Sequence, residues 1–261
     1  MVDHEPIVSC LCITRGNPVF LERAIRCFES QTYKNKELVL VYESDDENIE
    51  KRMNAFCKDD VFAINAGINP KLTLGELRNI AIQSCTGEYF CQWDDDDWHH
   101  RERIEVQLRF ALKNHKKASL LLYWLIYDAL EEDAYVSFMG PWSGSLLCKK
   151  ELITADLCYP KIKKSEDAHF TSKLYMLNCV YPIVMPALYI YVVHGNNTWE
   201  RPHFMKLFKR SHKLPKDISI DIKAIIEYKY SDAYSTEMLC SKRFLQEIDY
   251  LLHLKPKRNS G

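Results

Sequence analysis

Four consecutive aspartates, Asp94 to Asp97, are the residues whose types and spacing most directly indicate chemistry, and a tryptophan flanks them on each side. Adjacent carboxylates repel one another, so such a run usually lies on a solvated surface. Here an apolar segment, Tyr89 to Cys91, precedes the run and predicts a buried strand that ends at the carboxylates. A divalent cation such as Mg²⁺ or Mn²⁺, together with phosphate oxygens, would make the crowding tolerable. We therefore expect a metal and phosphate site, and the alternative is an acidic loop without a ligand.

Polar residues also follow three other segments that are predicted to be strands. They are Thr14 and Arg15 after 7–13, Glu43 after 37–42, and His194 after 187–193. In an open α/β sheet, ligands bind outside the carboxyl ends of the strands. We therefore expect these side chains to converge on the crevice that contains the aspartates.

The first half of the chain alternates between predicted strands and helices. Apolar runs predict the strands, and amphipathic segments with N-capping residues such as Asn17 predict the helices. The expected order is strand 7–13, helix from Pro18, strand 37–42, weaker helix around 49–56, strand 61–64, helix 73–85, strand 89–93 and helix 101–114. This order is typical of a doubly wound sheet, because strand–helix–strand crossovers are right-handed and parallel. No G-x-G-x-x-G motif follows the first strand, which disfavours a dinucleotide-binding Rossmann fold.

The second half has a different pattern. The apolar runs 120–127 and 135–138, separated by an acidic turn, predict an antiparallel hairpin. The segment 141–145 contains small residues and is expected to be a loop that leads into a strand at 146–148.

Helices are expected to close the chain. Ser165 is predicted to cap a helix that runs to Leu177 and has two acids in its first turn, where they suit the helix dipole. Two more helices are expected at about 219–229 and 236–254, and the tail 255–261 is expected to be disordered.

The composition excludes several classes of protein. The chain has 261 residues, of which 47% are hydrophobic, so it can bury a sizeable core. Its net charge of −1 argues against a nucleic-acid partner. No two of the ten cysteines stand in a C-x-x-C pair, which disfavours a zinc ribbon and indicates reduced thiols.

The apolar segments do not predict a membrane span. The runs 118–130 and 179–193 are too short, or too interrupted by proline, to cross a bilayer. The segment 1–6 lacks the basic and apolar blocks of a signal peptide. We therefore expect a cytoplasmic protein, and a peripheral contact with the inner face of a membrane stays open. The basic stretch 206–216 fits either a solvated face or a patch that faces phosphate or a membrane. The sequence indicates no oligomeric state.

Several motifs, in order, resemble the family 2 glycosyltransferases, which have the GT-A fold. They lie at 8–15 and 20–33, at 75–81, at 87–98 with Arg103 and Ile104, and at 166–167. Each segment alone is a weak signal, but their order along the chain makes the resemblance specific. It covers roughly residues 5–200.

The resemblance implies an α/β protein of the GT-A fold with a doubly wound mixed sheet. Residues 1–200 would form the glycosyltransferase domain, with a nucleotide-sugar-binding half at 1–98 and an acceptor half at 99–200. Residues 201–261 would form a C-terminal helical extension. The implied activity moves a sugar from a nucleotide diphosphate sugar, with uridine diphosphate as the expected carrier, to a hydroxyl of a glycan or lipid-linked saccharide. Synthesis of bacterial surface polysaccharide is the expected setting.

The resemblance also implies roles for individual residues. Asp96 and His194 would hold the metal, Mn²⁺ or Mg²⁺, which would act as a Lewis acid on the leaving diphosphate. The residues expected to contact the nucleotide sugar are Thr14, Arg15, Glu43, Arg78, Asp94 and Asp95. Those expected to contact the acceptor are Trp142, Gly144, Ser145 and Glu166. Glu43 stands where the family usually has an aspartate, which leaves the identity of the nucleotide base open.

Asp167 is expected to be the general base of an inverting single displacement. Structural roles remain as alternatives: Glu166 and Asp167 as first-turn helix acids, His194 as a structural histidine, Arg78 as a surface cation and Trp142 as core. Two other functions stay open. One is a nucleotidyl- or phosphoryl-transfer enzyme with two metals on the aspartates, and the other is a fold relative that has lost catalysis.

Overall fold

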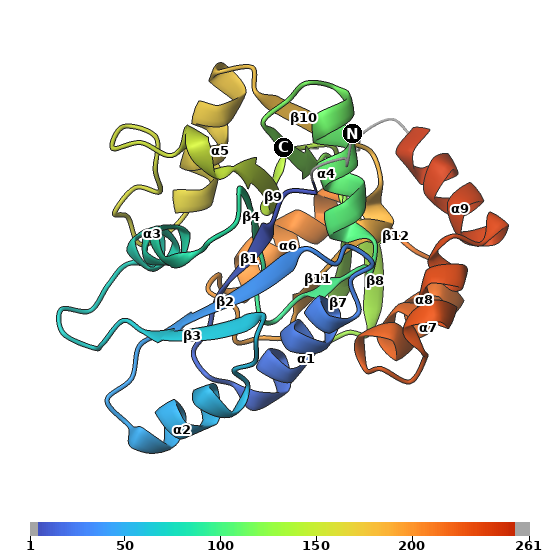
Figure 1. Ribbon diagram of the computed structural model, residues 1–261. Coiled ribbons are helices and arrows are strands. Elements are labelled where there is room, and N and C mark those ends of the chain that lie inside the picture. Colours follow the sequence, from blue (N-terminus) through green and yellow to red (C-terminus); the bar gives the residue numbers. More distant parts are fainter. Residues whose placement is uncertain (1–4, 254–261) are drawn as a thin grey trace.

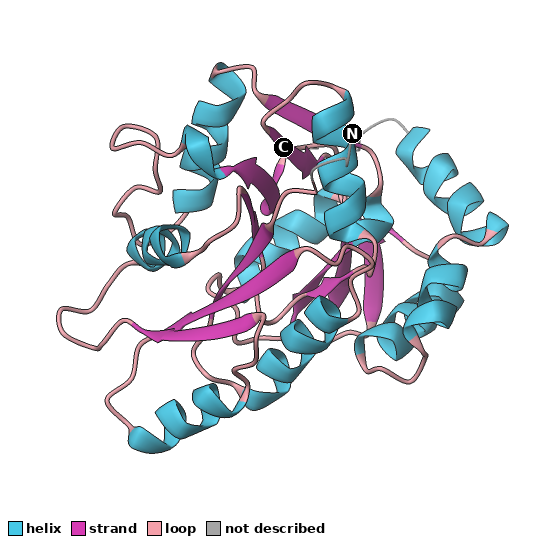
Figure 2. Ribbon diagram, viewed as in Figure 1, coloured by secondary structure: helices cyan, strands magenta, loops and turns pink. Residues whose placement is uncertain are grey.

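Two mixed β-sheets of seven and five strands, surrounded by helices, form the part of the chain that the computed structural model describes, residues 5–253 (Figures 1 and 2). The larger sheet has the strand order β10-β6-β9-β4-β1-β2-β3, and the smaller has the order β12-β8-β7-β11-β5. The tail that was expected to be disordered, 255–261, lies outside the described residues.

The first half forms the doubly wound part of the larger sheet, as predicted. Its elements are β1 (Val8–Ile13), α1 (Pro18–Glu29), β2 (Lys36–Tyr42), α2 (Glu47–Ala55), β3 (Val61–Asn65), α3 (Leu74–Ser84) and β4 (Tyr89–Gln92). Strand β1 pairs in parallel with both β2 and β4, and β2 pairs in parallel with β3. Cys10 and Cys12 of β1 pack in the same core cluster as α1, whereas Leu11 packs in the cluster that contains α3. Successive side chains of a strand point to opposite faces, so α1 and α3 cover opposite faces of this sheet.

Local sequence explains where these helices begin. The Asn17 side chain accepts hydrogen bonds from the first backbone amides of α1, and Pro18 is its first residue. Thr73 and Glu76 form a reciprocal capping box at the start of α3. Both helix starts agree with the sequence prediction.

The second half adds strands to both sheets. Its elements to the last long strand are β5 (Trp98–His99), α4 (Arg103–Lys113), β6 (Ala118–Leu121), β7 (Leu125–Asp128), β8 (Asp133–Val136), β9 (Trp142–Lys149), α5 (Glu166–Met176), β10 (Val180–Ile183) and β11 (Tyr189–Val193). Strands β7 and β8 form the predicted antiparallel hairpin.

Three predictions in this half were wrong. The run 120–127 is divided between β6 of the larger sheet and β7 of the smaller one, and both parts are buried, so hydropathy does not show the change of sheet. The segment 141–145 is mostly strand rather than loop, because β9 begins at Trp142 and pairs antiparallel with β6 and β4. Strand β11 begins at Tyr189, since Pro186–Leu188 forms a short 3₁₀ helix.

The C-terminal region packs onto the rest of the protein. It consists of α6 (Arg201–Arg210), β12 (His212–Lys213), α7 (Lys216–Ile226), α8 (Asp232–Leu239) and α9 (Lys242–His253). The helix expected at 219–229 corresponds to α7, the helix expected at 236–254 is divided between α8 and α9, and α6 was not predicted. Strand β12 pairs with β8, and α7 shares a core cluster with α1 and β1. The domain boundary after residue 200 stays a prediction.

Ion pairs account for part of the basic stretch 206–216. Lys213 and Lys216 both pair with Asp133, the first residue of β8, at 2.6 and 3.4 Å. Because these lysines are exposed, the pairs contribute little stability, but they neutralise that end of the stretch. Within residues 5–253, no helix is long and apolar enough to cross a membrane.

Candidate active site

The aspartate run lies in the loop between β4 and β5, and each carboxylate has different partners. Thr14 Oγ1 donates to Asp95 Oδ2 at 2.6 Å, so the end of β1 is tied to this loop. Asp96 Oδ2 lies 2.9 Å from His194 Nε2 and 3.4 Å from the side-chain amide of Asn197. The loop therefore receives side chains from the ends of β1 and β11, as the sequence predicted.

Asp97 has a structural role at the base of this loop. It is fully buried, and it accepts hydrogen bonds from the Tyr189 hydroxyl and from the backbone amide of Val192 at 2.9 Å. Burial raises the pKa of Asp97 well above its ordinary value, and the charges of Asp96 and Asp94 raise it further. Asp97 thus fixes β11 against the loop and is not available to a ligand.

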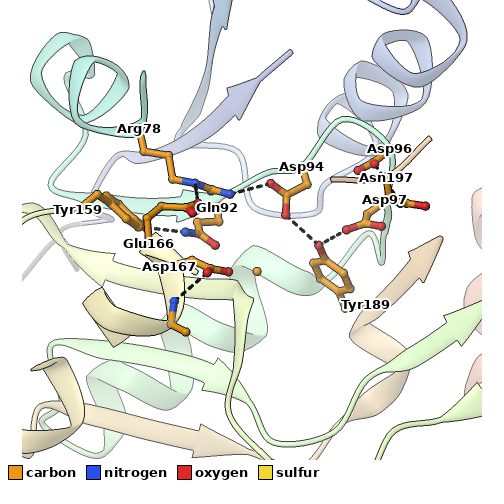
Figure 3. A network of polar contacts seen from close by, with 12 residues as sticks. Arg78, Gln92, Asp94, Asp96, Asp97, Tyr159, Glu166, Asp167, Tyr189 and Asn197 are labelled. Carbon is orange, nitrogen blue, oxygen red and sulfur yellow. Dashed lines mark hydrogen bonds and ion pairs between the residues drawn. The ribbon is translucent and has the colours of Figure 1, made fainter. Parts of the chain in front are cut away.

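Arg78 is buried at the centre of the site rather than exposed on α3. Only 6% of the residue is accessible. Its Nε lies 3.2 Å from Glu166 Oε1, and its Nη2 lies 3.3 Å from Asp94 Oδ1. The interpretation of Arg78 as a surface cation was therefore wrong. Figure 3 shows the resulting chain of contacts, which runs from Glu166 through Arg78 and Asp94 to Tyr189 and Asp97.

Two neutral side chains complete the surroundings of Arg78. The guanidinium lies 5.7 Å from the centre of the Tyr159 ring. The hydrogen-bond partners place the Gln92 amide oxygen toward the Tyr159 hydroxyl, at 2.6 Å, and toward Arg78 Nη1, at 3.0 Å. Each of the three nitrogens of the Arg78 guanidinium therefore has a hydrogen-bond partner, and a buried charge is tolerated only when it is paired in this way.

The segment that bears Glu166 and Asp167 is docked on α3 by two close contacts. The Asn79 side chain accepts from the Tyr159 amide at 3.1 Å and donates to the Tyr159 carbonyl at 2.9 Å. A Cβ atom at Gly75 would lie only 2.2 Å from the Pro160 carbonyl oxygen, so only glycine permits this approach. These contacts bring residues 159–167 next to Arg78.

Glu166 and Asp167 lie in the first turn of α5 and have different surroundings. Glu166 is 2% exposed and is held by Arg78, whereas Asp167 is half-buried and accepts only from the Ala168 amide, at 2.8 Å, among the described contacts. Burial raises the pKa of Asp94, and the charges of Asp96 and Asp167 add to the rise against the opposing charge of Arg78. Because Arg78 bonds both Asp94 and Glu166, the first turn of α5, which also bears Asp167, lies beside the aspartate loop.

Ser165 does not cap α5 through its side chain, contrary to the prediction. Its backbone has a φ of 63°, in the left-handed region, and its hydroxyl makes no capping hydrogen bond. The Ser165 carbonyl still accepts from the His169 amide at 3.1 Å. The abrupt turn before α5 therefore depends on the docking of residues 159–160, which the sequence alone does not show.

The remaining predicted donor residues lie at the edge of the site. Glu43 Oε1 accepts from the Leu72 amide at 3.0 Å and so holds the loop between β3 and α3. Arg15 is exposed just after β1.

The predicted acceptor residues on β9 have unequal exposure. Ser145 is fully buried, where its hydroxyl accepts from the Leu121 amide and donates to the Trp142 carbonyl. Gly144 is also buried, and a Cβ there would lie 3.0 Å from the Trp142 indole. Both residues therefore support Trp142, which is half-buried and stacks on Trp124 with 4.7 Å between ring centres.

Sequence reasoning missed three residues of the site. Tyr191 resembles a core residue of β11, but its ring packs 5.0 Å from Trp142, and its pKa is raised by burial and then by Asp97, Asp96, Asp94 and Asp167. Asn197, which contacts Asp96, stands in a polar turn whose pairing the sequence does not reveal. Arg103 is fully buried and bonds the Gln92 carbonyl at 2.9 Å and His99 Nδ1 at 2.6 Å, which fixes both ends of the aspartate loop.

Comparison with known proteins gives a family match. The family model described as glycosyl transferase family 2 matches residues 9–169. An uncharacterized glycosyltransferase of Haemophilus influenzae is 30% identical over 116 residues, which cover 43% of this chain and 45% of that protein. One of Rickettsia felis is 30% identical over 111 residues, or 42% of this chain and 18% of that protein. The matched region is thus less than half the length of either relative.

Solved structures with the same fold cover nearly the whole chain. The structure of S. aureus TarS in complex with UDP-GlcNAc gives a TM-score of 0.58 at 16% identity and covers 94% of this chain and 79% of that one. The TarS complex with UDP covers 92% of this chain. The mannosyltransferase PcManGT of Pyrobaculum calidifontis, in complex with GDP-Man and Mn²⁺, gives a TM-score of 0.58 at 14% identity, with coverage of 96% and 73%. At such identities the likeness concerns the fold, which is GT-A, as predicted.

The crowding of the aspartates predicts a pH-dependent stability. Burial, followed by the charges of Asp96 and Asp94, raises the pKa of Asp95 to about 7, whereas an unfolded aspartate titrates near about 3.9. The cost of ionising Asp95 is therefore absent at low pH and grows as the pH rises from about 4 to about 7. Without divalent metal, we expect Asp95→Asn to raise the melting temperature by about 2–6 °C at pH 8, and by less than half as much at pH 5.

The control for this measurement is Asp45→Asn, which removes an exposed carboxylate beyond β2 and should change neither melting temperature. An equal rise for Asp95→Asn at both pH values would contradict this account of the aspartate loop.

Proposed function

Because the chain belongs to glycosyl transferase family 2 and has the GT-A fold, we propose that it transfers a sugar from a nucleotide diphosphate sugar to an acceptor hydroxyl with inversion. The observation that supports this most strongly is the approach of Asp167 to the aspartate loop, with Arg78 bonded to both Asp94 and Glu166. A uridine diphosphate sugar is the proposed donor. The TarS structure contains UDP-GlcNAc and the mannosyltransferase structure contains GDP-Man, so the two nucleotide carriers to compare are UDP and GDP.

The residues at the loop fit a divalent metal, Mn²⁺ or Mg²⁺. Within residues 5–253, no group of three or more His, Cys, Asp and Glu side chains could hold an ion by itself. Asp96 and His194 nevertheless converge within 2.9 Å, and two protein ligands suit an ion that completes its shell with water and phosphate oxygens. When bound, such an ion would act as a Lewis acid toward the diphosphate leaving group.

The other loop residues are suited to the donor. Asp95 and Thr14 present a hydrogen-bonded carboxylate and hydroxyl pair at the carboxyl ends of β4 and β1, where ribose or sugar hydroxyls would bind. Asp94 is held by Arg78 and lies 3.5 Å from the Tyr189 hydroxyl, so its orientation is fixed before the donor binds. Arg15 and Glu43, which lie at the edge, would contact the nucleotide.

Asp167 is the proposed general base. Glu166 already neutralises Arg78, so Asp167 is the carboxylate of this pair that remains available to an acceptor. It would take the proton from the acceptor hydroxyl while that oxygen forms a bond to the anomeric carbon. The bond from that carbon to the diphosphate breaks on the opposite face, which gives inversion.

The acceptor is proposed to be a glycan or a lipid-linked saccharide that packs on aromatic side chains. The ring centres of Trp142 and Tyr191 lie 5.0 Å apart, and burial, followed by the charges of the loop aspartates and Asp167, raises the pKa of Tyr191. Aromatic faces suit the apolar faces of sugar rings. A cytoplasmic location remains a prediction.

The two other functions are less well supported. A two-metal phosphoryl-transfer enzyme needs acids that are free for metal, yet Asp97 is bonded to β11 and Asp94 to Arg78. A relative without catalysis would not require both the Asp96–His194 pair and a free Asp167. The family match and these contacts favour glycosyl transfer.

Replacement of the base tests the proposed mechanism. We expect Asp167→Asn to reduce sugar transfer by about 10²–10⁴-fold, the range typical of general-base loss, and to leave the affinity for the nucleotide sugar nearly unchanged. Asp156→Asn is the matched control, because this exposed residue lies in the same segment before α5 and should keep full activity. Transfer by Asp167→Asn near the rate of the unmodified chain would show that the base is another residue.

Replacement of the metal ligand tests the donor site separately. A thermal-shift panel of nucleoside diphosphates and nucleotide sugars with Mn²⁺ first identifies the carrier, since a ligand of the native state raises the melting temperature. Calorimetry with that carrier should then show Mn²⁺-dependent binding that Asp96→Ala abolishes. If Asp96→Ala binds the carrier as tightly as the unmodified chain, with and without Mn²⁺, the assignment of Asp96 is wrong.

A further inference from the structure

A basic and aromatic cluster, defined here as Lys164, Trp199, His203 and Lys206, lies outside the site described so far. The Lys164 ammonium lies 4.6 Å from the centre of the Trp199 ring. The His203 ring stacks on the same indole, with 4.4 Å between centres and 16° between planes. Burial lowers the pKa of His203, and the positive charges of Lys206 and Lys164 lower it further, so both lysines are close to this imidazole.

The cluster is joined to the active site through both of its chain segments. Lys164 precedes Asp167 by three residues, which span at most about 11 Å. Trp199 follows Asn197, which contacts Asp96, by two residues, or at most about 7 Å. The segments that bear the proposed base and the proposed metal ligand therefore both lead to this cluster.

A row of aromatic rings connects the cluster to the proposed acceptor wall. His203 contacts Phe204 at 5.6 Å between ring centres, Phe204 contacts Tyr191 at 5.9 Å, and Tyr191 contacts Trp142 at 5.0 Å. Trp142 and Tyr191 are the residues proposed to face the acceptor sugar. Because Phe204 is 2% exposed, this row is buried packing that holds α6 and its cluster against the strand that bears Tyr191.

Within residues 5–253, the two lysines of the cluster have no carboxylate partner. Among the described residues, no ion pair involves Lys164 or Lys206, whereas the nearby Arg201 is bonded to Asp128 at 2.6 Å. The amino-terminal end of α6, with its positive helix dipole, is next to the cluster, and no side chain caps it. Three cationic or donating groups beside one half-buried indole favour an anionic ligand.

The residue types of the cluster fit a phosphate group. Lysine ammonium groups act as point charges that suit the several oxygens of a phosphate.

We propose that the acceptor carries a phosphate group, which Lys164, His203 and Lys206 bind beside Trp199. This inference rests on the proposed glycosyl transfer and specifies its acceptor as a phosphorylated saccharide. The phosphate group would lie at the cluster, and the attacked hydroxyl would lie at Asp167.

The test uses glucose 6-phosphate as the probe and the indole signal of Trp199 as the readout. The chain has five tryptophans, so the Trp199 signal in ¹⁵N-labelled protein is assigned by its loss in Trp199→Phe. Saturating nucleoside diphosphate and Mg²⁺ occupy the donor site, so that the probe does not bind there. We expect glucose 6-phosphate to shift the Trp199 signal and glucose at the same concentration to leave it in place.

Charge reversal provides the matched comparison on one helix. Lys206→Glu should weaken the binding of glucose 6-phosphate by about 10-fold or more, since a charge-assisted contact is replaced by repulsion. Lys209→Glu makes the same change three residues along α6, on a lysine that does not act on His203, and should change the affinity by less than about 2-fold. Equal losses in the two variants, or no shift with glucose 6-phosphate, would overturn the proposal.

Two further measurements separate this inference from its premises. Slow hydrolysis of the nucleotide sugar by the unmodified chain without acceptor tests the proposed function alone. Donor hydrolysis without phosphate-dependent shifts refutes the inference and leaves glycosyl transfer standing, whereas no donor hydrolysis refutes the proposed function itself. Sedimentation with phosphatidylglycerol vesicles that requires Lys206 and is not displaced by glucose 6-phosphate would assign the cluster to a membrane and contradict the proposal.

Discussion

The buried guanidinium of Arg78 is the interaction on which the rest of the site depends. It lies on α3, yet it bonds Asp94 in the loop after β4 and Glu166 at the start of α5, at 3.3 and 3.2 Å. A buried charge is tolerated only when it is fully paired, and removal of one partner typically costs about 3–5 kcal/mol. Arg78 therefore fixes the distance between the proposed donor site and the proposed base, which come from opposite halves of the chain.

The aspartate loop shows how a crowded set of carboxylates is divided between structure and function. Asp97 accepts a hydrogen bond from β11, and Asp94 forms an ion pair with Arg78, so both carboxylates already have partners within the protein. Among residues 5–253, the side chains of Asp95 and Asp96 contact a hydroxyl, an imidazole and an amide, and these leave room for a cation and for donor hydroxyls. The basic cluster around Trp199 has the opposite charge, so the site combines an acidic centre with a basic outer end.

The sequence predicted the parts of this arrangement that depend on local physics. The alternation of elements, the cap at Asn17, the helix that begins after Thr73, and the convergence of Thr14, the aspartates and His194 were all confirmed. It failed where partners are distant in the chain. The change of sheet within 120–127, the burial of Arg78 and the approach of Pro160 to Gly75 depend on tertiary packing that no local pattern encodes. Tyr191 was missed because a tyrosine in an apolar strand resembles core.

A double-mutant cycle on Arg78 and Glu166 tests the central claim most directly. Unfolding free energies are measured for Arg78→Met, for Glu166→Gln and for the double variant, with the exposed pair Lys117 and Glu151 as the control cycle. We predict a coupling of about 2 kcal/mol or more for the buried pair and below about 1 kcal/mol for the exposed pair. Additive effects of the Arg78 and Glu166 replacements, within about 0.5 kcal/mol, would contradict the claim that this ion pair holds the two halves of the site together.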